Sequence, residues 1–169
     1  MKEFTRLFDT IYYQQAKFKQ ADAFAAKENG SWNRYSTDEI IDKANKVSLA
    51  LLKLGVTQDD KIAIISNNRP EWNMVDIGIL QIGAVNVPIY PTISEGEYKF
   101  IFNDAEIKYA FVSDAKLFAK INSIKDQVPS LKGIYSFGMV SGCKNFKELL
   151  AWAEGGNMQE VEDLKGRIK

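Results

Sequence analysis

The chain alternates short apolar runs with helical patterns, and this alternation constrains its fold more than any other feature. Continuous apolar runs occupy residues 62–65 and 109–112. Runs of this length without polar alternation are typical of strands buried on both faces of a parallel sheet. Amphipathic patterns of about 10 to 14 residues separate them, which indicates βαβ units. The sequence therefore predicts a layered α/β domain whose mostly parallel sheet is flanked by helices, with right-handed crossovers.

Capping signals mark where the helices begin. Ser36 with Glu39 and Ser94 with Glu97 match the capping-box pattern. Pro70 suits the first turn of another helix. The predicted helices cover residues 4–19, 37–54, 70–82, 114–127 and 145–153, with one more opening at Ser94. Further strands are expected over residues 84–89 and 133–137.

One proline and a turn dipeptide refine the strand predictions. Pro88 cannot donate to a sheet ladder, so strand 84–89 lies at a sheet edge or ends early. Asn29-Gly30 lies between two short strand patterns, residues 23–26 and 32–35, and is a strong hairpin signal. We therefore expect a separate β-hairpin before the first capping box.

The first helix carries an apolar face formed by Phe4, Leu7, Phe8, Ile11 and Phe18. The spacing is that of an amphipathic helix. Packing of this face on the core is the favoured interpretation, and docking on a membrane surface is the alternative. We assign residues 1–154 to one domain. Residues 155–169 have thin apolar content and are predicted to be a loosely held tail.

Absent residue types exclude several kinds of chemistry. The 169 residues include no histidine, which excludes Ser-His-Asp catalysis and histidine-ligated metals. The one cysteine, Cys143, cannot form an internal disulfide, and its Gly-Ser surroundings favour a simple turn position. Equal numbers of acidic and basic residues, 22 each, argue against a nucleic-acid binder. No signal peptide or membrane span is recognisable, so we expect a cytoplasmic location.

Two segments lie where ligands bind in open α/β sheets, beyond the carboxyl ends of predicted strands. Residues 66–72 combine asparagines, Arg69 and a helix start, which is compatible with an anion site but favours a tight turn. Residues 88–94 hold two prolines, which could shape a pocket wall but favour a rigid crossing from strand to helix. Neither glycine-rich nucleotide fingerprint occurs. The acidic runs at residues 59–60 and 160–163 are interpreted as solvated surface.

Three stretches resemble adenylate-forming enzymes, the group of acyl-CoA synthetases, luciferases and peptide-synthetase adenylation domains. Residues 34–41 resemble the first conserved motif of the group, and residues 80–90 resemble the second. Residues 68–72, followed by 88–92, resemble the long-chain fatty-acid–CoA ligase branch. The residues that carry this signature, to which we assign structural roles, are Asn68, Arg69, Pro70, Glu71, Trp72, Gly83, Pro88, Tyr90, Pro91 and Thr92.

The resemblance covers residues 5–154 and implies the N-terminal subdomain of a larger AMP-binding enzyme. It implies a parent that uses ATP, Mg²⁺ and coenzyme A to convert a fatty acid into acyl-CoA, AMP and pyrophosphate through an acyl-adenylate. The family's phosphate loop, adenine segment, ribose-binding Asp and mobile Lys all lie downstream of this region. We therefore assign no catalytic, cofactor-binding or metal-binding residue here. We expect the chain alone to be inactive and to bind no cofactor.

Other functions remain open at this stage. One alternative is a stand-alone α/β module that binds a nucleotide or flavin, or regulates a partner. Another is an interaction domain that self-associates through an exposed apolar face. Peripheral membrane association is compatible with the apolar first helix. Within the ligase interpretation, a medium-chain or aryl acid substrate is also open.

Overall fold

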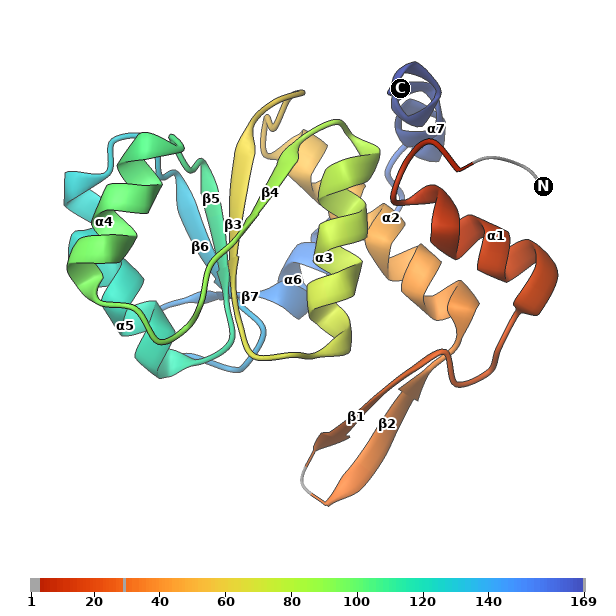
Figure 1. The fold of residues 1–169 in the computed structure, drawn as a ribbon, viewed down its shortest axis with the longest axis horizontal. Coiled ribbons are helices and arrows are strands. Elements are labelled where there is room, and N and C mark those ends of the chain that lie inside the picture. The colour runs from red at the N-terminus through yellow and green to blue at the C-terminus, as the bar shows by residue number, and fades with distance from the viewer. Residues whose placement is uncertain (1–3, 29, 169) are drawn as a thin grey trace.

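A five-stranded parallel sheet forms the centre of the computed structural model, which describes residues 4–28 and 30–168 (Figure 1). The strand order is β4-β3-β5-β6-β7, and every neighbouring pair is parallel. The strands are β3 (Lys61–Ile65), β4 (Val85–Pro88), β5 (Tyr109–Val112), β6 (Gly133–Ser136) and β7 (Lys144–Asn145). The predicted α/β architecture with a parallel sheet is confirmed.

The order of the strands agrees with their sequence patterns. The two continuous apolar runs became β3 and β5, which lie next to each other inside the sheet, and all four residues of β5 are buried. The strand with Pro88 is β4, which lies at the edge and ends at that residue, as predicted. No sequence pattern predicted β7, because two residues are too few to show a periodicity.

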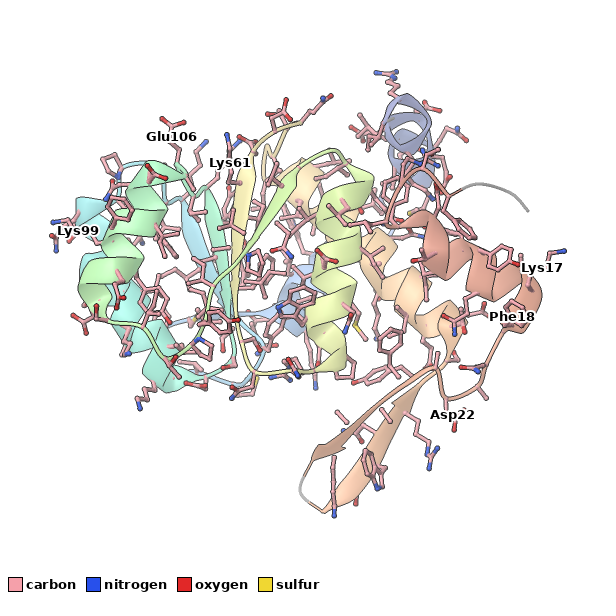
Figure 2. All side chains as sticks on the ribbon, viewed as in Figure 1. Lys17, Phe18, Asp22, Lys61, Lys99 and Glu106 are labelled. Carbon is pink, nitrogen blue, oxygen red and sulfur yellow. The ribbon has the colours of Figure 1, made fainter. Side chains whose placement is uncertain are left out.

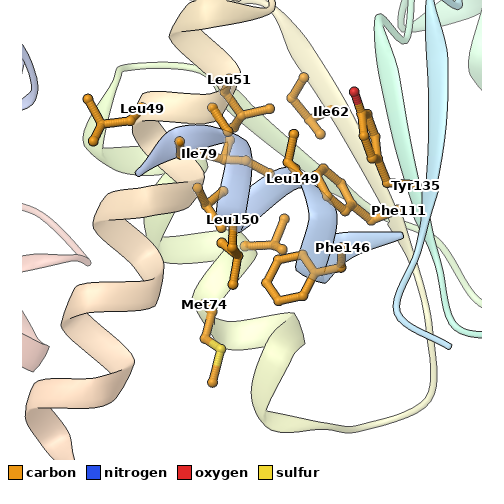
Figure 3. Close-up of a cluster of buried hydrophobic side chains, with 14 of the residues drawn as sticks. Leu49, Leu51, Ile62, Met74, Ile79, Phe111, Tyr135, Phe146, Leu149 and Leu150 are labelled. Atoms are coloured by element: carbon orange, nitrogen blue, oxygen red, sulfur yellow. The ribbon is translucent and has the colours of Figure 1, made fainter. Parts of the chain in front are cut away.

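Helices cover both faces of the sheet (Figure 1). One face carries α4 (Glu95–Asp104) and α5 (Ala115–Ile124), with a short 3₁₀ turn η1 (Lys125–Gln127) after α5. The other carries α2 (Thr37–Lys53), α3 (Pro70–Gln81) and α6 (Phe146–Ala153). Figure 3 shows the buried side chains of α2, α3 and α6 meeting those of β3, β5 and β6. The result is a three-layer α/β/α core.

The helix starts confirm the capping predictions and add one. The side chains of Ser36 and Ser94 each accept a hydrogen bond from the backbone N–H three residues later. In turn, the carboxylates of Glu39 and Glu97 accept hydrogen bonds from the backbone N–H groups of the two serines. Asn145 and its partner Glu148 form a third reciprocal cap at α6. Each pair satisfies two backbone N–H groups that would otherwise lack partners.

The first helix is shorter and more exposed than predicted. It is α1 (Asp9–Phe18), so its start lies after Phe4 and Leu7. Phe8 and Ile11 are buried, but Phe4, Leu7 and Phe18 are 45%, 76% and 62% exposed. The prediction that the whole apolar face packs on the core was therefore wrong. The physical reason is that α1 packs mainly against α2 and buries only a narrow side against it.

The predicted hairpin is present and extends away from the sheet (Figure 1). Its strands are β1 (Phe24–Glu28) and β2 (Ser31–Tyr35), which pair antiparallel with Phe24 opposite Tyr35. Gly30 has φ +83°, as the tight turn requires. Asn29, the other turn residue of the prediction, lies outside the described residues.

The last helix is α7 (Met158–Arg167), which packs on α2 and α3. Its Val161 is fully buried, and the Arg6 guanidinium donates to the backbone carbonyl oxygens of Lys165 and Ile168. The division of the chain at residue 154, with a loosely held tail beyond it, stays a prediction.

Candidate functional site

The loops that follow β3 and β4 enclose a cavity of about 570 Å³ at the carboxyl-terminal edge of the sheet. Because the two strands are parallel neighbours, residues 66–69 and 89–94 leave the sheet side by side. The sequence placed both segments at strand ends, and the structure brings them together around one space. The lining residues are Ile64, Ser66, Asn67, Asn68, Trp72, Pro88, Ile89, Tyr90, Pro91 and Thr92.

Six of the ten signature residues line this cavity, and the other four have different places. The six are Asn68, Trp72, Pro88, Tyr90, Pro91 and Thr92. Pro70 is buried as the first residue of α3. Arg69 and Glu71 pair with each other beside the cavity. Gly83 lies past the far end of α3 with φ +74°, a backbone conformation that favours glycine. The structural roles assigned to these ten residues stay predictions.

The positive charge of Arg69 is already matched within the chain. Its Nε and Nη2 donate to the two carboxylate oxygens of Glu71 at 2.9 and 3.1 Å. The guanidinium also lies 5.0 Å from the centre of the Phe137 ring. Burial opposes the ionisation of Glu71, but hydrogen bonds from Arg69 and from the Glu71 backbone outweigh it and lower the pKa of that carboxyl group. The pair therefore braces the start of α3, and the cavity receives no net charge from it.

The cavity wall combines neutral polar groups with apolar rings. Asn67, Asn68 and Thr92 supply amides and a hydroxyl, while Trp72 and Tyr90 supply aromatic surface. Among the described residues that line the cavity, none is charged. Such a lining suits an apolar or uncharged portion of a ligand better than a phosphate or a metal ion.

Two contacts that the sequence could not reveal hold the outer wall in place. The hydroxyl of Tyr98, on α4, donates to the backbone carbonyl of Tyr90 at 2.9 Å. Lys120, on α5, donates through Nζ to the carbonyl of Ile93 at 2.9 Å. Burial raises the pKa of Tyr98 to about 12, so its hydroxyl stays a donor at neutral pH. No motif of the sequence assigned this role to Tyr98.

The remaining chemistry-bearing groups do not assemble a reactive centre near the cavity. Within the described residues, no three His, Cys, Asp or Glu side chains lie close enough together to hold a metal ion. Burial, with Glu148 nearby, raises the pKa of the Cys143 thiol to about 11, which disfavours the nucleophilic thiolate. No helix in the described part of the chain is long and apolar enough to cross a membrane.

Comparisons with known proteins agree on one family. The sequence model for the AMP-binding enzyme family matches residues 12–163. A long-chain-fatty-acid–CoA ligase of Drosophila melanogaster is 30% identical over 63% of this chain and 16% of its own length. A long-chain-fatty-acid–CoA ligase of Xenopus laevis is 27% identical over 74% of this chain and 17% of its own length. The chain thus spans about one sixth of the length of these curated relatives.

Solved structures show the same fold. The adenylation and carrier didomain of a carboxylic acid reductase from Segniliparus rugosus aligns with a TM-score of 0.78 at 14% identity, over 93% of this chain and 28% of that one. A long-chain-fatty-acid CoA ligase from Rhodopseudomonas palustris, described as putative, aligns with a TM-score of 0.75 at 23% identity, over 88% of this chain and 36% of that one. Given the match over residues 12–163, the chain belongs to the AMP-binding enzyme family.

Proposed function

We propose that this chain is the N-terminal part of a long-chain fatty-acid–CoA ligase. The observation that carries the proposal is the family match over residues 12–163, joined to about 30% identity with long-chain ligases. The parent would join a fatty acid to AMP with release of pyrophosphate, and coenzyme A would then displace AMP. In this two-step reaction, the chain supplies a scaffold and one wall of the acyl pocket.

The chemistry of the cavity supports a role toward the acyl chain. Trp72 and Tyr90 present ring surfaces to the cavity. Pro88 and Pro91 stiffen the backbone on either side of Tyr90. The lining has neither the cations that phosphates need nor the carboxylates that Mg²⁺ prefers. The described residues therefore do not fit MgATP, which the parent would bind with residues outside this chain. Coenzyme A is assigned to the parent in the same way.

The proposal extends to partners and location. The chain alone lacks the catalytic motifs and is inactive, and the parent acts in the cytoplasm. The exposed ring of Tyr13, on α1, makes edge-on pairs with Phe18, at the end of α1, and with Phe4, which precedes the helix. This apolar surface supports self-association of the isolated chain, and it is the place where peripheral contact with a membrane would occur.

The test compares the isolated chain with the complete product of its gene. AMP release is measured with palmitate, ATP, Mg²⁺ and coenzyme A. We expect turnover from the complete product and none above a boiled control from residues 1–169. Trp72→Ala in the complete product is expected to change the ratio of kcat/KM between two acyl chain lengths by about tenfold.

The matched control is Trp32→Ala, because Trp32 is 60% exposed on the hairpin and does not line the cavity. It should leave the chain-length ratio unchanged. Turnover by residues 1–169 alone would contradict the proposal, and so would a complete product that lacks the family's phosphate loop. An unaltered ratio in Trp72→Ala would contradict the acyl-wall assignment.

A further inference from the structure

A second cavity, of about 340 Å³, lies at the opposite edge of the sheet from the candidate site. Its lining includes Tyr109 and Gly133, which are the first residues of β5 and β6. In Figure 2, Lys61 and Glu106 mark this amino-terminal edge of the sheet. The cavity is therefore separate from the one at the carboxyl-terminal ends of β3 and β4.

Three lysines from three different segments surround this second cavity. Lys125 lies on η1, Lys132 precedes β6, and Lys144 begins β7. All three are exposed, and within the described residues none of their ammonium groups has an ion-pair or hydrogen-bond partner. Among the described residues, no carboxylate lines this cavity. Like charges that converge on one concave surface create a positive potential that attracts anions.

A tyrosine hydroxyl at the cavity wall adds a directional donor. Tyr135 lines the cavity and is only 4% exposed. Its ring stacks on Phe111, with 5.6 Å between the ring centres, and Figure 3 shows its hydroxyl pointing away from Phe111 and Phe146. In the described chain this hydroxyl has no hydrogen-bond partner, whereas the neighbouring Tyr109 hydroxyl donates to the carbonyl of Leu54 at 3.0 Å. The ring is buried while the hydroxyl stays accessible at the cavity wall, so it is free to donate to a bound ligand.

A glycine keeps the space between the two tyrosines open. A Cβ atom at Gly133 would lie 3.3 Å from Cδ1 and Cε1 of Tyr109, and 3.8 Å from Cε2 of Tyr135. Contacts of 3.3 Å are tighter than most real Cβ contacts, so the Tyr109 ring would have to shift to admit the added atom. A larger residue would therefore fill part of the cavity.

We propose that this cleft binds a phosphate-bearing small molecule through Lys125, Lys132, Lys144 and the Tyr135 hydroxyl. Lysine ammonium groups act as mobile point charges for phosphate, and the phenolic hydroxyl gives one oriented hydrogen bond. An adjoining cavity of about 290 Å³ shares Leu54, Tyr135 and Lys144 and is also lined by Glu148, Leu149 and Trp152. The Glu148 carboxylate accepts a hydrogen bond from the backbone N–H of Asn145. Leu149 and Trp152 offer an apolar surface to the organic part of the ligand. This assignment is independent of the ligase proposal, because it concerns the opposite edge of the sheet.

The test measures binding of inorganic pyrophosphate to residues 1–169 by titration calorimetry at low ionic strength, with amide chemical shifts as the map. We expect shifts centred on residues 125, 132–135 and 144. The triple variant K125Q/K132Q/K144Q should weaken binding by at least about tenfold, since each hydrogen bond to a charged group contributes substantially. Tyr135→Phe keeps the ring on Phe111 and should weaken binding by about tenfold.

The charge-matched control is K17Q/K27Q/K116Q, three exposed lysines on α1, β1 and α5. It should bind pyrophosphate as the unaltered chain does. If both triple variants bind pyrophosphate equally more weakly, the loss follows from net charge alone, and the proposal is overturned. Unchanged affinity in the Tyr135→Phe and K125Q/K132Q/K144Q variants would also overturn it. Binding to phosphatidic acid vesicles without any binding of free pyrophosphate would overturn the proposal as well.

Discussion

At the scale of single residues, small side chains set how closely the two central helices approach. A Cβ atom at Gly78, on α3, would lie 2.6 Å from Cγ1 of Val47 and 2.8 Å from the backbone oxygen of Ala44 on α2. The buried Ser48 hydroxyl donates to the carbonyl of Gly78 at 2.8 Å across the same contact. The sequence predicted only the range of this helix and its Pro70 start, so it assigned no role to Gly78.

Gly78→Ala tests this close approach. Alanine is favoured over glycine in helices by about 1 kcal/mol, so a free helix would gain stability. Here overpacking against a backbone oxygen should outweigh that gain and lower the free energy of unfolding by about 1–3 kcal/mol. Gly96→Ala in α4 is the control, because its Cβ would meet only Oγ of Ser94 at 4.0 Å. Urea unfolding of both variants should give opposite signs; a stabilised Gly78→Ala would contradict the packing.

At the scale of elements, sequence patterns located what local physics determines. The four buried residues of β5 form an unbroken apolar run, and the reciprocal bonds of Ser36 and Ser94 need only four consecutive residues. Elements that depend on distant neighbours were misjudged or missed. The exposure of Phe18 on α1 follows from how little of that helix contacts α2, and no periodicity reports this.

The candidate site was predictable to a similar extent. The rule that ligands bind beyond strand ends located residues 66–72 and 88–94 without any contact information. It could not place Arg69, because the neutralising pair with Glu71 depends on side-chain geometry. Nor could it identify Tyr98 and Lys120, whose bonds to the outer wall join α4 and α5 to a loop that precedes both.

Three helices meet at a polar contact that tests how α1 is held. The Tyr12 hydroxyl donates to Oε1 of Gln81, and it also lies 3.0 Å from Oδ1 of Asn45. Gln81 is fully buried and donates in turn to Oγ of Ser48 at 3.0 Å. This network joins α1 to α2 and α3, and its Gln81 and Ser48 side chains are fully buried.

Tyr12→Phe should therefore destabilise the chain by about 1–3 kcal/mol, the usual cost of leaving a buried acceptor without its donor. Tyr13→Phe is the matched control, since Tyr13 is 37% exposed and its hydroxyl has no partner among the described residues. Its effect should stay within about 0.5 kcal/mol. Thermal or urea unfolding measures both variants, and equal losses would show that the network does not hold α1.

At the scale of the whole molecule, a net charge of zero conceals an uneven arrangement of charges. Without histidine, the carboxyl groups dominate how stability changes below neutral pH. Two of them, Glu71 and Asp76, lie on α3, and their pKa values are shifted in opposite directions. Burial opposes ionisation of both, but Arg69 and the backbone lower the pKa of Glu71. For Asp76 burial prevails over the hydrogen bond from Asn86, so its pKa is raised.

The opposite shifts predict opposite pH profiles for two variants. The stability from ionised Glu71 is present above the ordinary carboxyl range and is lost as pH falls through its lowered pKa. Glu71→Gln should thus cost about 1–2 kcal/mol at pH 7, and less as the pH falls. Asp76→Asn removes a charge that costs stability once the pH exceeds its raised pKa, and it adds an amide donor beside Asn86, whose Oδ1 is buried without a partner. Asp76→Asn should stabilise the chain at pH 7. This gain should shrink as the pH falls, because Asp76 then becomes protonated in the unaltered chain. Urea unfolding between pH 7 and pH 4 measures both, and profiles of the same sign would refute these charge assignments.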